Sequence, residues 1–208
     1  MCRYGTDAPT GGRHAQRSYH FVLAGLCQSA SAGQITSAYT DLVTEKDCLT
    51  YAKAGENDGD WADLSCSGYR GYPVLLGYDD ARESVFYGFP PADMTSSWES
   101  FVGFNSAGPK VEWRVETTGD VSVPFAAIHR RSVNTGDDGT KKTDVLVVAK
   151  VAQMEGREGC TVALVAAGSA NANEEARKIA DEKARSFACG KDTRIVVGDV
   201  PAFGRVDN

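Results

Sequence analysis

The number and placement of its cysteines constrain this chain more than any other feature of its sequence. Four of the six cysteines lie in the part of the chain that has a globular composition, at Cys48, Cys66, Cys160 and Cys189. An even number of cysteines in an exported domain is typical of disulfides. Three pairings are possible, and we favour Cys48–Cys66 with Cys160–Cys189, because each pair flanks one local supersecondary unit. Four buried thiols are the alternative. A zinc site is not indicated, because the cysteines form no C-x-x-C pair.

The first 32 residues differ from the rest and are predicted to be an export leader. Basic residues within 13–17 precede the apolar run 21–27, and the small residues 30–32 (Ala-Ser-Ala) follow. This order matches the charged, apolar and small-residue regions of a secretory signal. The apolar run is short and the stretch before it is long and polar, and a misassigned start codon would explain the extra residues. A disordered cytoplasmic tail is the alternative to an export leader. Lipidation at Cys27 is not expected, because Leu26 occupies the place of the required small residue.

Length and composition suit one globular domain. The chain has 208 residues, of which 42% are hydrophobic and 24% charged, and both fractions are ordinary for such a domain. We expect a leader over 1–32, one β-rich domain over 33–198 and a loose C-terminal tail over 199–208. The formal net charge of −6 gives no general attraction for nucleic acid. No apolar run approaches the ~20 residues of a membrane-spanning helix, so no transmembrane segment is predicted. The sequence does not indicate an oligomeric state.

Apolar residues recur with the two-residue period of β-strands along most of the chain. The clearest example is Lys110–Glu116, where valines and Trp113 alternate with charged residues. Strands are predicted over 61–66, 73–78, 83–89, 110–116, 124–133, 144–153, 160–167 and 194–198. The runs 144–153 and 160–167 are largely apolar on both faces and are expected to form the most central hairpin. Residues 38–54 could form a strand or a short helix.

The clearest helix is predicted over Ala172–Cys189. Small and apolar residues recur there every three or four positions, Glu174 and Glu175 suit its N-terminal end, and Gly190 ends it. One further helical turn is suggested within 90–109, where aromatic residues recur every three positions. The short connections favour an antiparallel sheet. We therefore predict an α+β fold, a mainly antiparallel β-sheet with this one long C-terminal helix packed on one face and a last short strand after it.

Residues suited to catalysis are sparse in the predicted domain. Its one histidine, His129, falls on a predicted strand and is expected to be half exposed, and no Gly-x-Ser-x-Gly motif is present. Asp79-Asp80 and Asp137-Asp138 fall in predicted turns, which favour aspartate. The stretch Glu56–Asp60, with Asp63 beyond it, is expected to be a solvated turn, with a weak calcium site as the alternative. No catalytic residue, metal site or cofactor is therefore predicted.

The segment 67–73 is the best candidate for a binding site. Tyr69, Arg70 and Tyr72 stand among glycines directly after Cys66. Tyrosine and arginine dominate the hot spots of protein interfaces. Glycines would let the loop project, and a disulfide at Cys66 would hold its base. The alternative is a β-turn whose tyrosines pack against the domain.

Two stretches carry a resemblance to a group of known proteins. One is 60–88, in which a cysteine is followed by Gly-Tyr-x-Gly-x-Pro-Val. The other is 159–190, in which a cysteine strand is followed by Ala-Asn-Ala-Asn-Glu-Glu-Ala-Arg and then Cys-Gly. Over most of 38–198 the chain resembles small uncharacterised exported proteins of proteobacteria. The resemblance implies export and carries no activity with it.

These observations favour a periplasmic or secreted binding module without catalytic activity. Its partner would be another extracytoplasmic protein. The module could recognise that partner as periplasmic enzyme inhibitors recognise their targets. One alternative is a hydrolase that uses carboxylates to act on envelope polymers, which requires two facing acidic side chains in a pocket. A structural protein of the envelope is the third possibility.

Overall fold

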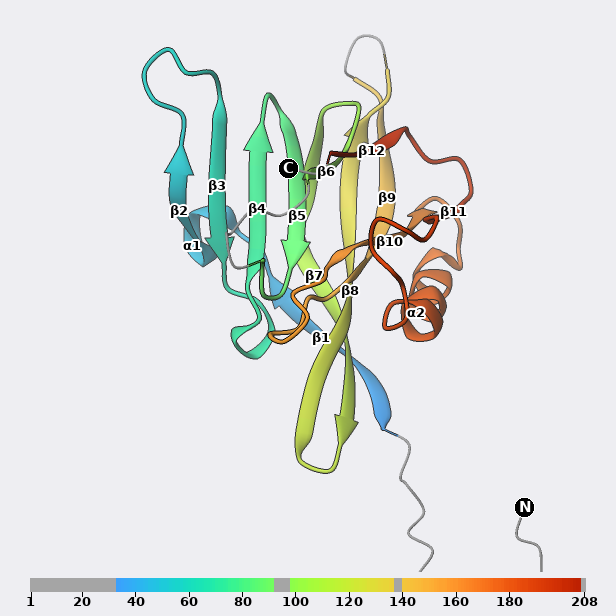
Figure 1. Ribbon diagram of the computed structural model, residues 1–208. Helices are drawn as coiled ribbons and strands as arrows, with labels where there is room; N and C mark the ends of the chain where they lie inside the picture. The colour runs from blue at the N-terminus through green and yellow to red at the C-terminus, as the bar shows by residue number, and fades with distance from the viewer. Residues whose placement is uncertain (1–32, 92–97, 137–139, 207–208) are drawn as a thin grey trace, which may run out of the picture. The chain divides into compact units, whose positions relative to one another are not determined.

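The computed structural model describes residues 33–91, 98–136 and 140–206 (Figure 1). Its elements are, in chain order, β1 (Gln34–Asp41), α1 (Thr44–Asp47), β2 (Cys48–Lys53), β3 (Trp61–Cys66), η1 (Tyr69–Gly71), β4 (Val74–Asp79), β5 (Arg82–Tyr87), β6 (Trp98–Phe101), β7 (Asn105–Thr118), β8 (Val121–Asn134), β9 (Lys142–Lys150), β10 (Cys160–Ala166), α2 (Ala172–Lys183), β11 (Ile195–Val197) and β12 (Phe203–Val206). The fold is α+β and mainly antiparallel β, as predicted. The predicted leader lies outside the described residues.

Six strands form the larger sheet, in the order β1-β7-β8-β9-β10-β11. Every neighbouring pair is antiparallel except β10 and β11, which run parallel. The hairpin β9–β10 is buried on both faces, as its sequence predicted. Among the described strands it is not the most central pair, because one strand, β11, lies beyond β10, whereas β8 and β9 each have two strands on their outer side.

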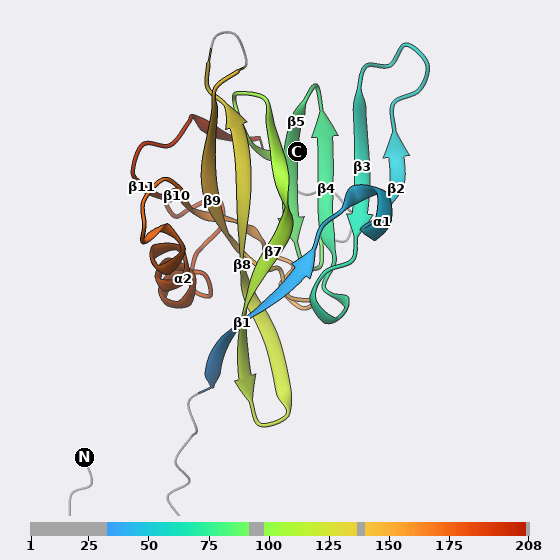
Figure 2. The ribbon, with the colours of Figure 1, turned by 180° about the vertical axis from the view of Figure 1, so that it is seen from behind.

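A second sheet, β2-β3-β4-β5, packs against one face of the larger sheet, and Figures 1 and 2 both show β5 beside β7. The alternation predicted for Lys110–Glu116 explains how the two sheets pack. Val111, Trp113 and Val115 point from β7 toward the second sheet and are almost completely buried. They meet apolar residues of β4 and β5, such as Val74. The second sheet is therefore attached through the apolar face of β7.

Helix α2 covers the opposite face of the larger sheet. Ala176, Ile179 and Ala180 pack on apolar side chains of β8, β9 and β10. The charged face of β7 also meets this helix. Arg114 donates two hydrogen bonds to Asp181, at 2.8 and 2.7 Å. The helix is therefore held by an apolar contact and by ion pairs that lie beside it.

The helix begins where the sequence predicted but ends at Lys183, not at Cys189. Beyond the helix, the N–H of Ala188 donates to the carboxylate of Asp192 at 2.9 Å, and the N–H of Cys189 donates to Glu158 at 3.0 Å. These side chains replace the carbonyl acceptors that a continuing helix would supply. Asp192 follows the predicted helix and Glu158 precedes β10, so neither acceptor belongs to the periodic segment 172–189 from which the helix was predicted.

Two further predictions were wrong at the β6–β12 ribbon. The three-residue spacing of aromatic residues near Trp98 belongs to a strand, not to a helical turn, and the expected loose tail contains β12. The two strands pair antiparallel, and the rings of Phe101 and Phe203 meet edge to face at 4.8 Å. Val133 and Val145 of the larger sheet lie in the same apolar cluster. Phe203 is partly buried in this cluster, and its packing orders a segment whose sequence carries no strand signal.

Both predicted disulfides are present. Cys48 and Cys66 face each other across β2 and β3, and Cys160 at the start of β10 is bonded to Cys189 after α2. Internal disulfides are compatible with a secreted or periplasmic protein. Among the described residues, no helix has the length and apolar character needed to cross a membrane.

Replacing Cys160 and Cys189 together by alanine is expected to lower the free energy of unfolding by about 3–4 kcal/mol, because the bridge closes a long loop. The two cysteines are 29 residues apart in the chain. Cys48 and Cys66 are 18 apart, so replacing that pair should cost about 3 kcal/mol. Urea unfolding of the two variants and the parent measures both effects. An unchanged midpoint would show that the bridge contributes nothing to stability.

Candidate binding site

The three predicted binding residues Tyr69, Arg70 and Tyr72 lie together in the connection between β3 and β4. The disulfide at Cys66 closes the base of this connection, because Cys66 is the last residue of β3. Arg70 has a positive φ of 46°, and Gly71 follows with 86°. Two successive left-handed residues turn the backbone sharply, so the segment projects as a tight loop.

The two tyrosines hold this loop against the domain. The ring of Tyr69 lies 6.4 Å from the ring of the buried Trp113. Tyr72 packs on Phe89, with ring centroids 5.0 Å apart, and its hydroxyl donates to Gln153 at 2.9 Å. Both tyrosines are half-buried. This packing agrees with the alternative prediction, a β-turn whose tyrosines pack against the domain. The two tyrosines therefore serve mainly to anchor the loop.

Gly68 brings the loop backbone close to the domain. A Cβ at this position would lie 2.2 Å from the carbonyl oxygen of Tyr72 and 2.9 Å from the ring of Trp113. Only glycine fits such a contact.

Of the three predicted binding residues, Arg70 is the one whose side chain is exposed. Its guanidinium lies 5.4 Å from the centroid of the Tyr69 ring, which is within the range of a cation–π contact. Among the described residues it forms no ion pair. The loop therefore presents one positive charge on a rigid base.

His129 is completely buried and not half exposed as expected. The hydroxyl of Tyr87 lies 2.7 Å from its Nδ1, and its Nε2 lies 2.7 Å from the carbonyl oxygen of Gly108. The carbonyl can only accept, so Nε2 carries the proton and Nδ1 accepts from Tyr87. The alternation of side chains along β8 could not reveal this burial, because the residue that covers His129, Tyr87, comes from the second sheet.

Burial lowers the pKa of the His129 imidazole to about 4, although its hydrogen bond to Gly108 acts in the opposite direction. The nearby charge of Arg131 lowers this pKa further. Arg131 is itself buried and donates to the carbonyl oxygen of Glu83 and to the side chain of Asn105. The imidazole is neutral at pH 7 and has no exposed surface, so it stabilises the interface between the sheets and does not face a substrate.

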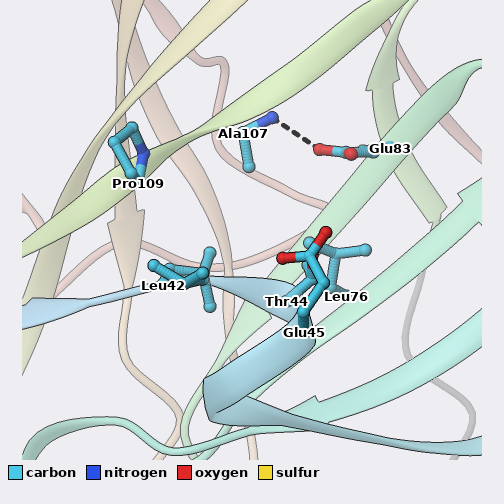
Figure 3. A pocket seen from close by; sticks show the side chains of 8 residues that line it. Leu42, Thr44, Glu45, Leu76, Glu83, Ala107 and Pro109 are labelled. Carbon is cyan, nitrogen blue, oxygen red and sulfur yellow. Dashed lines mark hydrogen bonds between the residues drawn. The ribbon is translucent and has the colours of Figure 1, made fainter.

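A pocket of about 240 Å³ opens between the two sheets near this network. Glu45 of α1 and Glu83 of β5 both line it, and Figure 3 shows the Glu83 side chain reaching toward Ala107 of β7. The carboxylate of Glu83 accepts a hydrogen bond from the N–H of Ala107 and lies 3.9 Å from Arg131. Sequence reasoning missed this pair of acids. Because Glu83 is already occupied by a donor and a cation, the pocket gives little support to a carboxylate hydrolase.

The other acidic candidates lie on turns. Asp79 is the last residue of β4, and Asp80 adopts a positive φ of 46° in the turn that follows, close to the predicted turn. Both side chains are exposed. Asp137-Asp138 lies outside the described residues. Within 33–91, 98–136 and 140–206, no three histidine, cysteine or acidic side chains gather closely enough to hold a metal ion. The calcium alternative for Glu56–Asp60 therefore gains no support.

Comparisons of the sequence and of the fold with known proteins found no match. No protein-family model matches the chain, no curated protein matches its sequence, and no solved structure matches its fold.

The burial of neutral His129 should make stability depend on pH. Its pKa of about 4 in the folded state lies below the ~6.5 of an unfolded chain, so the unfolded state binds the proton first as pH falls. The contribution of neutral His129 to the free energy of unfolding is complete above about pH 6.5 and is lost as the pH falls toward 4. Between about pH 7.5 and pH 5 the loss should reach about 2 kcal/mol.

Urea unfolding at these two pH values, on the parent and on His129→Gln, measures this loss. The glutamine variant is less stable but should lack this part of the pH dependence. Equal pH dependence in the two proteins would show that His129 is not the group responsible.

Proposed function

We propose that the protein is a periplasmic or secreted binding module without catalytic activity, which docks on another protein through the loop 67–73. The observation that carries the proposal is Arg70. It is exposed at a sharp turn, whereas the tyrosines on either side of it are packed on the domain. The backbone of a rigid loop has little conformational freedom left to lose on binding, and this favours affinity.

The chemistry of the loop indicates what the partner must offer. Arginine is the cation best suited to planar, bidentate recognition of a carboxylate. The partner would therefore present an acidic side chain in a recess large enough to admit the turn. An inhibitor of an extracytoplasmic enzyme would use such a projecting loop to enter the active site of its target. The two disulfides and the resemblance to exported proteins support the extracytoplasmic setting.

Replacing Arg70 by glutamine should reduce capture of the partner at least about tenfold, because a central arginine contact is commonly worth more than 1.4 kcal/mol. Parent and variant, each immobilised, are exposed to envelope extract, and captured proteins are quantified by mass spectrometry. Lys178→Gln is the matched control. It removes one positive charge from an exposed position on α2, and should leave capture unchanged.

Two outcomes would contradict the proposal. One is that no protein is captured specifically by the parent. The other is that Arg70→Gln and Lys178→Gln lose the same protein equally, which would show dependence on net charge and not on the loop. Thermal unfolding of each variant checks that the fold is kept.

A further inference from the structure

The second sheet has an outer face, turned away from the larger sheet, that carries aromatic side chains. Leu64 and Cys66 of β3 lie in the core between the sheets. Because side chains alternate along a strand, Trp61 and Asp63 of β3 belong to the outer face. The register places Asp63 opposite Gly77 of β4. The charge of Asp63 also acts on the hydroxyl of Tyr51 from β2.

Gly77 lets two side chains from distant elements approach each other. A Cβ at this position would lie 3.1 Å from the indole ring of Trp98 and 3.4 Å from a carboxylate oxygen of Asp63. The indole of β6 and the carboxylate of β3 therefore meet over the bare backbone of β4. Trp61 lies two residues before Asp63 on the same face of β3, and the charge of Asp63 reaches Tyr51 on the neighbouring strand. Three aromatic side chains therefore lie near one carboxylate.

The Asp63 carboxylate is poorly compensated. It is half-buried, and among the described residues it has neither a hydrogen bond nor an ion pair. Burial raises the pKa of Asp63, because the protein replaces part of the water around its charge. Burial, followed by the charge of Asp63, raises the pKa of Tyr51 as well. A carboxylate in this situation gains most from a cation that enters from outside.

The surroundings of the site are hollowed and acidic. A pocket of about 260 Å³ adjoins it, lined by Trp98 with Asp79 and Arg82. The β2–β3 and β4–β5 turns meet at this end of the sheet, since the N–H of Asp80 donates to the carbonyl oxygen of Asp60 at 3.1 Å. Arg82 is paired with Asp80. Within the turn segments 53–60 and 79–82, five acidic residues outnumber the two basic ones, Lys53 and Arg82: they are Glu56, Asp58, Asp60, Asp79 and Asp80.

We propose that this enclosure binds a positively charged side chain of a basic peptide segment in a partner protein. The guanidinium or ammonium group lies beside Asp63 and against the faces of the surrounding rings, which attract cations through their negative π-faces. A neutral sugar would also stack on aromatic rings, but it would leave the charge of Asp63 without a counter-ion. The enclosure is independent of the Arg70 loop, whose charge is opposite and which calls for an acidic partner.

The test uses a tetra-arginine peptide and a tetra-citrulline peptide of equal length, which differ in charge but hardly in shape. Binding to the full chain is measured by calorimetry at low salt. Asp63→Asn removes the carboxylate charge, and Glu174→Gln is the matched control, because it removes one charge from an exposed position on α2. Tyr51→Leu removes one ring from an exposed position, so it reports on the enclosure with little risk to the fold.

The expected result is that tetra-arginine binds at least about tenfold more tightly than tetra-citrulline. Asp63→Asn should weaken the binding of tetra-arginine at least about tenfold, and Tyr51→Leu should weaken it about threefold. Glu174→Gln should leave this binding unchanged. Three results would overturn the proposal: no binding of tetra-arginine to the parent, equal loss in Asp63→Asn and Glu174→Gln, or equal binding of the two peptides. Tighter binding of chitotetraose than of tetra-arginine would also overturn it, in favour of a glycan-binding face.

Discussion

The burial of one indole ring connects the parts of this fold that are far apart in sequence. Trp113 has no exposed surface, and it lies between the two sheets. Its N–H donates to the hydroxyl of Thr40 on β1 at 2.9 Å. The rings of Tyr87 on β5 and Tyr69 in the projecting loop lie 6.0 and 6.4 Å from it. A large aromatic ring contributes more buried area than any other side chain can, so the edge strand, the second sheet and the loop all depend on the same residue.

The alternation that buries Trp113 also decides what happens on the other side of β7. Its neighbours Glu112 and Arg114 point to the opposite face, where they are almost as deeply buried. They are compensated by Arg177 and Asp181 of α2. Burial alone would raise the pKa of Glu112, but the hydrogen bond from Arg177, together with nearby charges, lowers it overall. One strand therefore fixes both outer layers, one by apolar contact and the other by paired charges.

Local patterns predicted those parts of the structure that depend on neighbours along the chain. The alternation of Lys110–Glu116, the two disulfides and the start of the helix at Ala172 are of this kind. The burial of His129, the end of the helix and the ordered strand β12 depend on contacts with distant segments, and were predicted wrongly. The same limit applies to the candidate sites. The Tyr-Arg loop is contiguous and could be recognised, whereas the enclosure around Asp63 draws on four strands that no spacing brings together.

The two candidate surfaces, the Arg70 loop and the enclosure around Asp63, share strand β3, and this limits which partners could use both. Asp63 lies in the strand, and Cys66, at its end, anchors the loop that carries Arg70. A partner that uses both surfaces would therefore need to present a basic and an acidic group at a fixed separation. Such a pattern of opposite charges on a rigid sheet discriminates between partners, because a ligand with the charges reversed would be repelled at both positions. In such a complex the Cys48–Cys66 disulfide would support selectivity as well as stability, because it fixes the end of β3 from which the Arg70 loop departs.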